Sequence, residues 1–386
     1  MHICIVSGTF PPMHCGVGDS TKVIARALAR AGHQVTVLTS YSVDNPAGAD
    51  GYKVIGGVTG WRLADVPQII RLLRSIKPDA IVVQYPTKAY GRKLGIFVIP
   101  VSIRLARIVP GRRLLLILHE YLNAHWLKRL AIAAMVITVP QTLAFEDDLT
   151  RLRRWIPSAM ADIHARPPSP VHFDDVTLTE EERKEFRAQM GAANGDFLLI
   201  NFGLVSPAKG IESILQAHVA LLKQGLSTTV VIVGPPAEGN DEYVAHLKQQ
   251  SVELGIEKKV TWLGYQPEES VVKMLKAADV TVLPFVDGVR YPMSASFATA
   301  ASCGVPIITT ERSPSKSQNG LVTGNNAILV PPGDVPALTE AVKGLAANGD
   351  LRARIAKNAR EVASSTHGTA ATVQVILECL EGSRSA

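Results

Sequence analysis

At 386 residues, the chain is too long for one ordinary hydrophobic core and suits two domains. Its 47% hydrophobic and 19% charged residues exclude a disordered chain and fit a well-packed globular protein. The net charge is +6. The four cysteines lie far apart and form no CxxC pair, which argues against a disulfide framework or a structural zinc site and for a reducing compartment.

The amino terminus, "MHICIVSGTF", enters a predicted strand directly, without the charged region and cleavage site of a signal peptide. No run of about 18 apolar residues, the length that spans a bilayer, occurs in the sequence. We therefore expect a cytoplasmic protein.

In the first half of the chain, short apolar runs alternate with amphipathic segments. The segments "STKVIARALARAGH" and "DVPQIIRLLRSIKP" place apolar residues on one face at helical spacing, and they end at Gly32 and Pro78. Apolar runs separated by helices predict a parallel, doubly wound sheet. The predicted strands are Ile3–Val6, Gln34–Leu38, Ala80–Gln84, Leu114–Leu118 and Met135–Val139.

Residues 92–154 carry most of the positive charge, with eleven Lys and Arg residues against four acids, a net charge of +7. Basic residues flank and interrupt the apolar run "LGIFVIPVSIRLARIV" there. This pattern is typical of a segment that lies on an anionic membrane surface, which makes the inner membrane surface a candidate location. It is equally typical of a buried helix with a solvated basic edge. Nucleic acid is disfavoured as a partner because no recognised nucleic-acid motif accompanies the charge.

The composition changes at "IPSAMADIHARPPSPVHFDDV", a proline-rich, aperiodic stretch that indicates a linker. After a charged helix in "TLTEEERKEFRAQMG", strands and helices alternate again, through "DFLLINFGLV", "TTVVIVG", "KVTWLG", "DVTVLP", "VPIITT" and "AILVPPGD". We therefore predict two doubly wound domains that face a central cleft at the carboxyl ends of their strands. A nicotinamide dinucleotide is disfavoured, because the first loop lacks GxGxxG and the second strand ends without an acid.

Several fragments, in order along most of the chain, together resemble family 4 of the glycosyltransferases, which have the GT-B fold of two Rossmann-like domains. The resemblance implies transfer of a sugar from a nucleotide-sugar donor, with retention at the anomeric carbon and without a metal or other cofactor. It divides the chain into an acceptor-side domain (1–168), a nucleotide-sugar-binding domain (169–366) and a carboxyl-terminal helix (367–386) that crosses back to the first domain. The fragments are "PPMHCGVGDSTKVIARALARAGHQVTVLTS", "LLLILHEY", "FGLVSPAKGIESILQA", "KVTWLGYQPEESVVKMLKAADVTVLP", "CGVPIITT" and "GNNAILVPPGDVPALTEAV".

The resemblance also implies which residues bind the donor. Gly16, Val17 and Gly18 precede a helix, where glycines let a ligand approach and free N–H groups favour anions. The family places this loop against the donor phosphates and sugar. Gly203 and Lys209 belong to the motif whose lysine pairs with the donor diphosphate and stabilises the departing nucleotide. Lys209 is therefore a candidate for both donor binding and catalysis.

Other candidates come from loops that follow strands. In the family, the loop after one strand of the second domain takes the nucleobase, so Tyr265 and Gln266 are candidate donor contacts. His119 matches a histidine that reaches the donor sugar or the acceptor, which makes it a candidate catalytic residue with Glu120 beside it. His14 is a candidate base only under the mechanism of inverting relatives with the same fold.

The sequence departs from the family pattern at three positions. The two glutamates that the family carries, eight residues apart, correspond to Tyr291 and Thr299, and an expected arginine is replaced by Leu204. We predict that Arg290 supplies the missing cation as a catalytic, diphosphate-binding residue. Asp287 is predicted to take over a sugar- or phosphate-binding role; a solvated Arg–Asp loop is the alternative.

The helix after this loop keeps polar groups that suit a donor. Ser294 or Ser296 is expected to cap it, which leaves its first N–H groups facing an anion. Thr299 retains a hydroxyl for a hydrogen bond to the donor. Two functions stay open: an active transferase that acts on a glycan, lipid-linked or small-molecule acceptor, and a non-catalytic GT-B subunit that binds or supports a partner enzyme.

Overall fold

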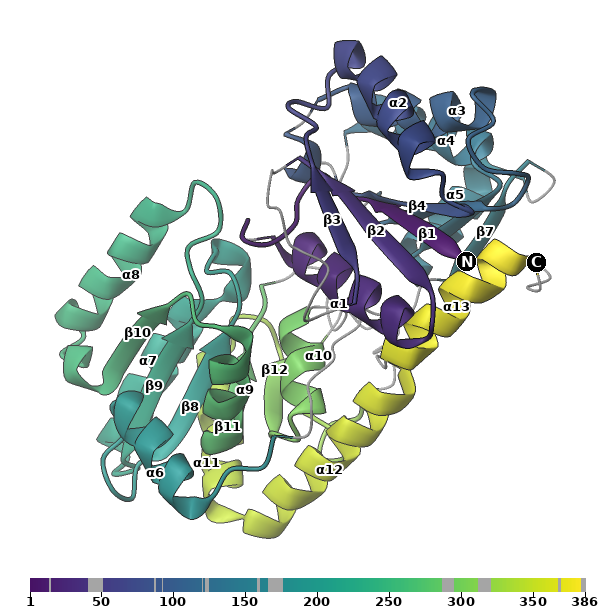
Figure 1. The fold of residues 1–386 in the computed structure, drawn as a ribbon. Coiled ribbons are helices and arrows are strands. Elements are labelled where there is room, and N and C mark those ends of the chain that lie inside the picture. Colours follow the sequence, from purple (N-terminus) through teal and green to yellow (C-terminus); the bar gives the residue numbers. More distant parts are fainter. Residues whose placement is uncertain are drawn as a thin grey trace. The chain divides into compact units, whose positions relative to one another are not determined.

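A computed structural model describes residues 1–13, 15–40, 51–86, 88–91, 93–119, 121, 125–157, 160–165, 176–286, 295–311, 321–366 and 369–382. The chain divides into two compact units, each built on its own parallel sheet (Figure 1). The first unit is Met1–Pro170 together with Gly368–Ala386, and the second is Val171–His367.

The first unit contains a seven-stranded parallel sheet in the order β3-β2-β1-β4-β5-β6-β7. The central strands are almost entirely buried, as expected for a parallel sheet with both faces covered. The strands are β1 (His2–Val6), β2 (Gln34–Thr39), β3 (Lys53–Gly56), β4 (Ala80–Tyr85), β5 (Leu114–Leu118), β6 (Gln141–Ala144) and β7 (Asp162–Ala165).

Helices cover both faces of this sheet. Ile24 and Leu28 of α1 pack with Ile376 and Cys379 of α13 in one cluster, so the last helix of the chain belongs to the first unit. α2 to α5 form the other layer. The helices are α1 (Gly16–Arg30), α2 (Val66–Ile76), α3 (Gly95–Leu105), α4 (Trp126–Thr138), α5 (Glu146–Trp155) and α13 (Thr369–Glu381), with 3-10 turns η1 (Leu63–Asp65) and η2 (Lys88–Tyr90).

The second unit has a six-stranded parallel sheet in the order β10-β9-β8-β11-β12-β13. Its strands are β8 (Phe197–Phe202), β9 (Thr228–Val233), β10 (Val260–Gly264), β11 (Val280–Leu283), β12 (Ile307–Thr310) and β13 (Ile328–Val330). Its helices are α6 (Glu180–Gln189), α7 (Ile211–Lys223), α8 (Asp241–Glu253), α9 (Glu268–Ala277), α10 (Ala295–Ser302), α11 (Val335–Ala347) and α12 (Gly349–Thr366), with 3-10 turns η3 (Pro207–Lys209) and η4 (Glu257–Lys259).

The predicted fold class of two doubly wound α/β units is confirmed, but two local predictions are wrong. Residues 135–139 are not a strand, because α4 continues to Thr138 and the strand follows at Gln141–Ala144. The apolar run fits either structure by composition, and burial of Ile132, Met135 and Val136 on one helical face decides it. The predicted linker also contains a strand, β7, which pairs with β6.

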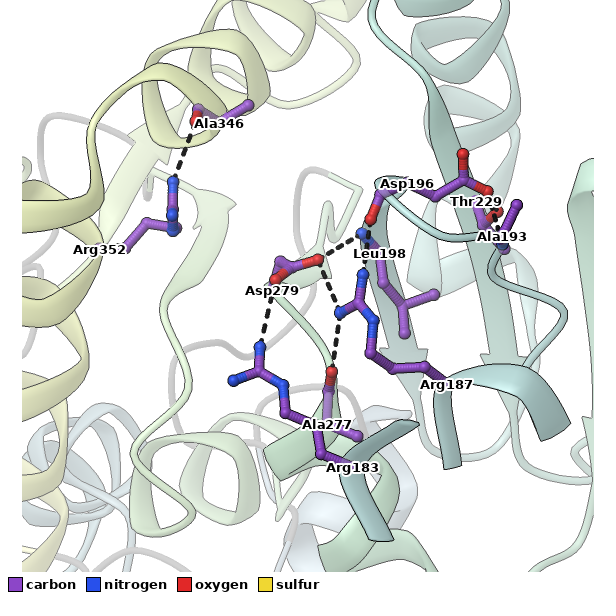
Figure 2. A network of polar contacts seen from close by, with 10 residues as sticks. All are labelled: Arg183, Arg187, Ala193, Asp196, Leu198, Thr229, Ala277, Asp279, Ala346 and Arg352. Atoms are coloured by element: carbon purple, nitrogen blue, oxygen red, sulfur yellow. Dashed lines mark hydrogen bonds and ion pairs between the residues drawn. The ribbon is translucent and has the colours of Figure 1, made fainter. Parts of the chain in front are cut away.

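Charged residues tie together the amino-terminal ends of β8 and β11 (Figure 2). Asp279 accepts hydrogen bonds from the N–H of Leu198 at 2.8 Å and from Arg187 at 2.9 Å, and Arg183 lies 3.5 Å away. The Arg187 guanidinium also donates to the carbonyl of Asp196 at 2.6 Å and to that of Ala277 at 3.0 Å. One helix, α6, is thereby fixed to this edge of the sheet.

Candidate functional site

The strand order of the second unit reverses direction between β8 and β11, and this creates a topological switch point at the carboxyl-terminal edge of the sheet. From β8 the chain winds outward through β9 and β10, and from β11 it winds the other way through β12 and β13. The loops after β8 and β11 therefore leave in opposite directions. Such a switch point leaves a crevice beyond the strand ends, where open α/β sheets bind their ligands.

The two central strands part before they reach this edge. β8 pairs with β11 only at Leu199 and Ile200. Beyond this point the side chain of Asn201 takes the place of the ladder, since its amide donates to the carbonyl of Val282 at 2.7 Å. The backbone is thus held open where the two loops diverge.

Lys209 brings these two loops together. It ends the 3-10 turn η3 after β8, and its Nζ donates a 2.9 Å hydrogen bond to Oγ of Ser296 in α10, which follows β11. The ammonium also lies 4.9 Å from the centre of the Phe285 ring, a cation–π distance. The lysine is half-buried and points across the switch point.

The ammonium of Lys209 has a hydroxyl and a ring as neighbours, and no carboxylate of the described residues pairs with it. Burial lowers its pKa from 10.5 to about 8, because the site withdraws the charge from water without an opposite charge to compensate. An anion that entered here would supply the missing charge and restore the ammonium form. The site is therefore electrostatically prepared for an anionic ligand.

Two glycines make this geometry possible. A Cβ on Gly203 would lie 2.4 Å from Oγ of Ser296 and 3.0 Å from Nζ of Lys209, and the backbone φ is +121°. A Cβ on Gly210 would lie 2.0 Å from the carbonyl oxygen of Pro284. Both positions need glycine, since any side chain would collide with the groups that meet at the switch point.

Ser296 is not a helix cap. It is the second residue of α10 and is 5% exposed, so its hydroxyl lies too far along the helix to serve as the N-cap and accepts the hydrogen bond from Lys209 instead. Thr299 lies one turn further along α10, is 4% exposed and packs within the second unit.

The loop after β10 contains the two predicted nucleobase contacts, Tyr265 and Gln266, of which one is exposed to solvent and the other is hydrogen-bonded within the loop. Tyr265 is 59% exposed, whereas Gln266 donates from its amide to the carbonyl of Leu263 at 2.9 Å. Leu204 follows Gly203 and is half-buried. The positions of His14, Glu120, Asp287, Arg290, Tyr291 and Ser294 lie outside the described residues.

In the first unit, Gly16, Val17 and Gly18 form the first turn of α1. Gly16 is exposed, and a Cβ added there would meet no described residue within 4 Å apart from its chain neighbours and the backbone of its own helix. Gly18, in contrast, packs closely against the backbone of Phe10. The first N–H groups of a helix have no intrahelical partners. The exposed start of α1 therefore offers donors that suit an anion.

His119 follows β5, and its Nε2 lies 2.6 Å from Oε1 of Gln84, a fully buried residue of the neighbouring strand β4. With the amide oriented so, the ring nitrogen is the donor. This contact fixes the imidazole at the carboxyl-terminal edge of the first sheet. It also shows that part of the polar capacity of His119 is used to anchor the ring.

Tyr90 is a residue of this edge that the sequence did not point to. Its hydroxyl donates to the carbonyl of Gln84 at 2.6 Å and contacts that of Val6 at 3.3 Å, so it bridges the ends of β4 and β1. Burial raises its pKa above the usual range. A Cβ on Gly8 would lie 2.3 Å from the carbonyl of Ala89, so the η2 turn packs tightly on the loop after β1.

Among the described residues, no group of three or more His, Cys, Asp or Glu side chains could hold a metal ion. None of the described helices is long and apolar enough to cross a membrane. None of the four cysteines, all of them among the described residues, forms a disulfide.

Residues 182–362 match the family model described as glycosyl transferases group 1. An α-D-kanosaminyltransferase of Streptomyces kanamyceticus is 27% identical over 202 residues, which are 50% of this chain and 47% of that protein. A D-inositol 3-phosphate glycosyltransferase of Nocardia farcinica is 32% identical over 105 residues, 27% of this chain and 23% of that protein. In both cases the match spans less than half of the relative's own length.

The crystal structure of Anabaena Alr3699/HepE in complex with UDP-glucose superposes with a TM-score of 0.79 at 20% identity, and the match covers 99% of this chain and 100% of that one. The fold is thus the GT-B fold of glycosyltransferases. The match to the family model lies within the second unit.

Proposed function

We propose that the protein transfers a sugar from a nucleotide-sugar donor to an acceptor. The observation that carries this proposal is Lys209, a half-buried cation without a carboxylate partner among the described residues, at the switch point of the matched domain. A donor diphosphate fits this site because it is a compact anion whose charge grows as the glycosidic bond breaks. A fixed ammonium lowers the energy of that charge.

In this proposal the other predicted residues contact the donor or the acceptor, as the sequence analysis expects. The first turn of α1, with Gly16, Val17 and Gly18, contacts the donor phosphates or sugar through its N–H groups. His119 acts at the sugar or acceptor, and its contact with Gln84 sets the orientation of the ring. The exposed ring of Tyr265 is the proposed contact for the nucleobase.

The remaining predicted contacts complete the donor site in this proposal. Gly203 gives the Lys209 side chain its space. Gln266, Ser296 and Thr299 are proposed to contact the donor or to shape its pocket. Asp287, Arg290 and Ser294 are proposed to act from the loop before α10, with Arg290 as a second cation.

Finer features of the reaction are also proposals. We infer membership of family 4, retention at the anomeric carbon and no requirement for a metal cofactor. The acceptor is proposed to be a glycan, a lipid-linked sugar or a small molecule, and the location to be cytoplasmic. The structural relative holds UDP-glucose, which makes UDP-sugars the first donors to test.

The experiment is a calorimetric screen of the purified chain against UDP, GDP, ADP, TDP and their common sugars, with Lys209→Ala and Lys259→Ala variants. Lys259 is the matched control, because it is a lysine of the same unit that is paired with Asp196 at 2.7 Å. Selective binding of one nucleotide that only Lys209→Ala loses would support the proposal. If none of the nucleotides bound, a non-catalytic subunit would be the better account, because Tyr291 and Thr299 stand where the family has glutamates.

A further inference from the structure

The second unit has a groove between the end of α9, the end of α10 and one side of α12. Helix α12 packs along α10 through small side chains, since Ala359 and Ala363 share one core cluster with Ala300 and Ala301 (Figure 1). A neighbouring side of α12 is left to line the groove. The volume of the groove is about 630 Å³, which lies within the range of sites that bind small molecules.

The charged side chains of the groove are mostly cations. Lys276 lies in the last turn of α9, and Lys357 and Arg360 lie three residues apart on α12. Of the described residues that line the groove, only Glu361 is acidic, and its carboxylate lies 4.0 Å from the ammonium of Lys357. Lys276 is half-buried and has no ion pair with another described residue. The lining therefore carries more positive than negative charge.

Helix ends explain part of this charge but not all of it. Both α9 and α10 end at the groove, and the carboxyl end of a helix favours cations. Each end supplies about half a negative charge, so the two ends together with Glu361 balance about two of the three cations. The groove thus keeps a surplus of positive charge for a ligand.

The residues that follow α10 form the buried part of the groove. Cys303 is 5% exposed, and burial raises the pKa of its thiol to about 12, although Lys276 and Arg360 lower it. The thiol is therefore neutral and does not offset the cations. A Cβ on Gly304 would lie 3.7 Å from Cδ of Arg360, so the stem of this arginine packs on the glycine. Lys276 from α9 and Arg360 from α12 thus lie close to the same few residues.

We propose that this groove binds a small molecule that carries a phosphate group. A guanidinium and an ammonium from different helices suit a phosphate between them, the first through paired N–H donors and the second as a compact charge. A phosphomonoester carries roughly two negative charges at pH 7, so it uses the surplus charge better than a single carboxylate does. The hydroxyl of Ser364 and the carboxylate of Glu361 line the same groove and suit the hydroxyl groups of such a molecule.

The groove is separate from the site around Lys209. Helix α10 begins beside Ser296, whose hydroxyl meets Lys209 at the carboxyl-terminal edge of the sheet, and it ends before β12 at the amino-terminal edge. A helix of eight residues is about 12 Å long, so a single phosphate cannot contact both sites. The proposal therefore does not rest on sugar transfer, and the two sites can be tested independently.

The test labels the full chain with pyridoxal 5′-phosphate, a phosphate ester whose aldehyde forms an imine with a lysine amine and releases water. Borohydride then reduces the imine, and mass spectrometry identifies the labelled lysine. We expect label at Lys276 or Lys357, in the wild type and in Lys209→Ala alike. Glycerol 3-phosphate should protect these lysines, inorganic phosphate should protect them more weakly, and glycerol should not protect them. Equal protection by inorganic phosphate would overturn the proposal in favour of a site for free phosphate.

Variants of α12 test the groove itself. Arg360→Ala should raise the concentration of glycerol 3-phosphate that halves the labelling by at least about tenfold. Ala356→Glu keeps all three cations but adds a carboxylate to the groove, so it should have the same effect. Arg354→Ala is the matched control, because Arg354 is exposed on the same helix and donates to the carbonyl of Gly324 instead. Absence of protection in the wild type, undiminished protection in Arg360→Ala and Ala356→Glu, or loss of protection in Lys209→Ala would overturn the proposal.

Discussion

The two edges of the sheet in the second unit treat charge in opposite ways. At the amino-terminal edge, Asp196 accepts hydrogen bonds from Lys259, Ser227 and Thr229, and Asp279 is held by a backbone N–H and two arginines. At the carboxyl-terminal edge, the ammonium of Lys209 meets a hydroxyl and an aromatic ring. The first edge is complete as it stands, whereas the second provides one charge and no counter-charge from the described residues.

Because the pKa values of Asp196 and Lys209 both differ from their ordinary values, the two residues make the free energy of unfolding depend on pH. Burial alone would raise the pKa of Asp196, but its hydrogen bonds hold it well below the usual range. Asp196 therefore stabilises the fold above the pKa it has in the unfolded chain, and this contribution is lost as pH falls through its folded pKa. At Lys209 the fold instead disfavours the charged form: its pKa of about 8 is below the ordinary 10.5, so the free protein gains stability as pH rises from about 8 to 10.5.

The largest expected effect on activity follows from removal of Lys209, the cation at the carboxyl-terminal edge of the second unit's sheet. Lys209→Ala should lower kcat for sugar transfer by about 100-fold or more, because the leaving diphosphate loses its fixed cation. Steady-state kinetics with the donor found by the nucleotide screen would measure it. Lys259→Ala is the control and should keep kcat within a few-fold of the wild type. Equal losses in the two variants would mean that the edges do not differ in function.

Removal of an acid from the amino edge should instead lower stability. Asp279→Ala breaks two arginine contacts and a backbone hydrogen bond, so we expect the free energy of unfolding to fall by about 3 kcal/mol. Urea denaturation would measure this loss, with Asp350→Ala, an exposed acid of α12, as the control. Nucleotide affinity of the folded variant should not change. A stability loss as small as that of the control would show that the network does not hold α6 to the sheet.

The pH dependence of binding sharpens the comparison. Above pH 7 the diphosphate is already ionised. Affinity should therefore stay level up to about pH 8 and then fall by up to about tenfold per unit, as Lys209 loses its proton before binding. Isothermal titration from pH 7 to 9.5 would show the inflection. Lys209→Arg keeps its charge throughout this range, so any binding that it retains should be level. A wild-type affinity without an inflection near pH 8 would contradict the assignment.

The smallest expected effect concerns the hydroxyl that meets Lys209. Ser296→Ala removes one hydrogen bond of 2.9 Å, so nucleotide affinity should fall by roughly three- to tenfold, corresponding to about 1 kcal/mol. Calorimetry would measure this change, and Ser302→Ala at the other end of α10 serves as the control. Unchanged affinity would show that Ser296 does not position the lysine in the complex.

Much of the fold could be predicted from the sequence, because parallel strands buried on both faces appear as continuous apolar runs. That rule fails for residues 135–139. The run "AIAAMVIT" is as continuously apolar as a buried strand, but it belongs to the helix α4, which has apolar residues on both its inner and its outer face. Within the site, the motif around Gly203 and Lys209 predicted that the loop after β8 belongs to the donor site.

The partners of Lys209 could not be predicted from the sequence. Ser296 lies 87 positions away, and its role depends on how the loops after β8 and β11 meet. The same holds for Tyr90, whose hydroxyl joins the ends of two strands, and for Asn201. Such contacts follow from sheet topology, which local patterns do not encode.

The central claim is that the buried Lys209 ammonium lacks a counter-charge until an anionic nucleotide binds. Its most direct test is thermal unfolding of the wild type and Lys209→Met at pH 7, each with and without the nucleotide that the screen selects. Methionine keeps the length of the side chain and its contact with Phe285 but removes the buried charge. The account predicts that the variant melts at a higher temperature than the wild type without nucleotide, and that added nucleotide stabilises only the wild type. A variant that melts lower and is still stabilised by nucleotide would contradict it.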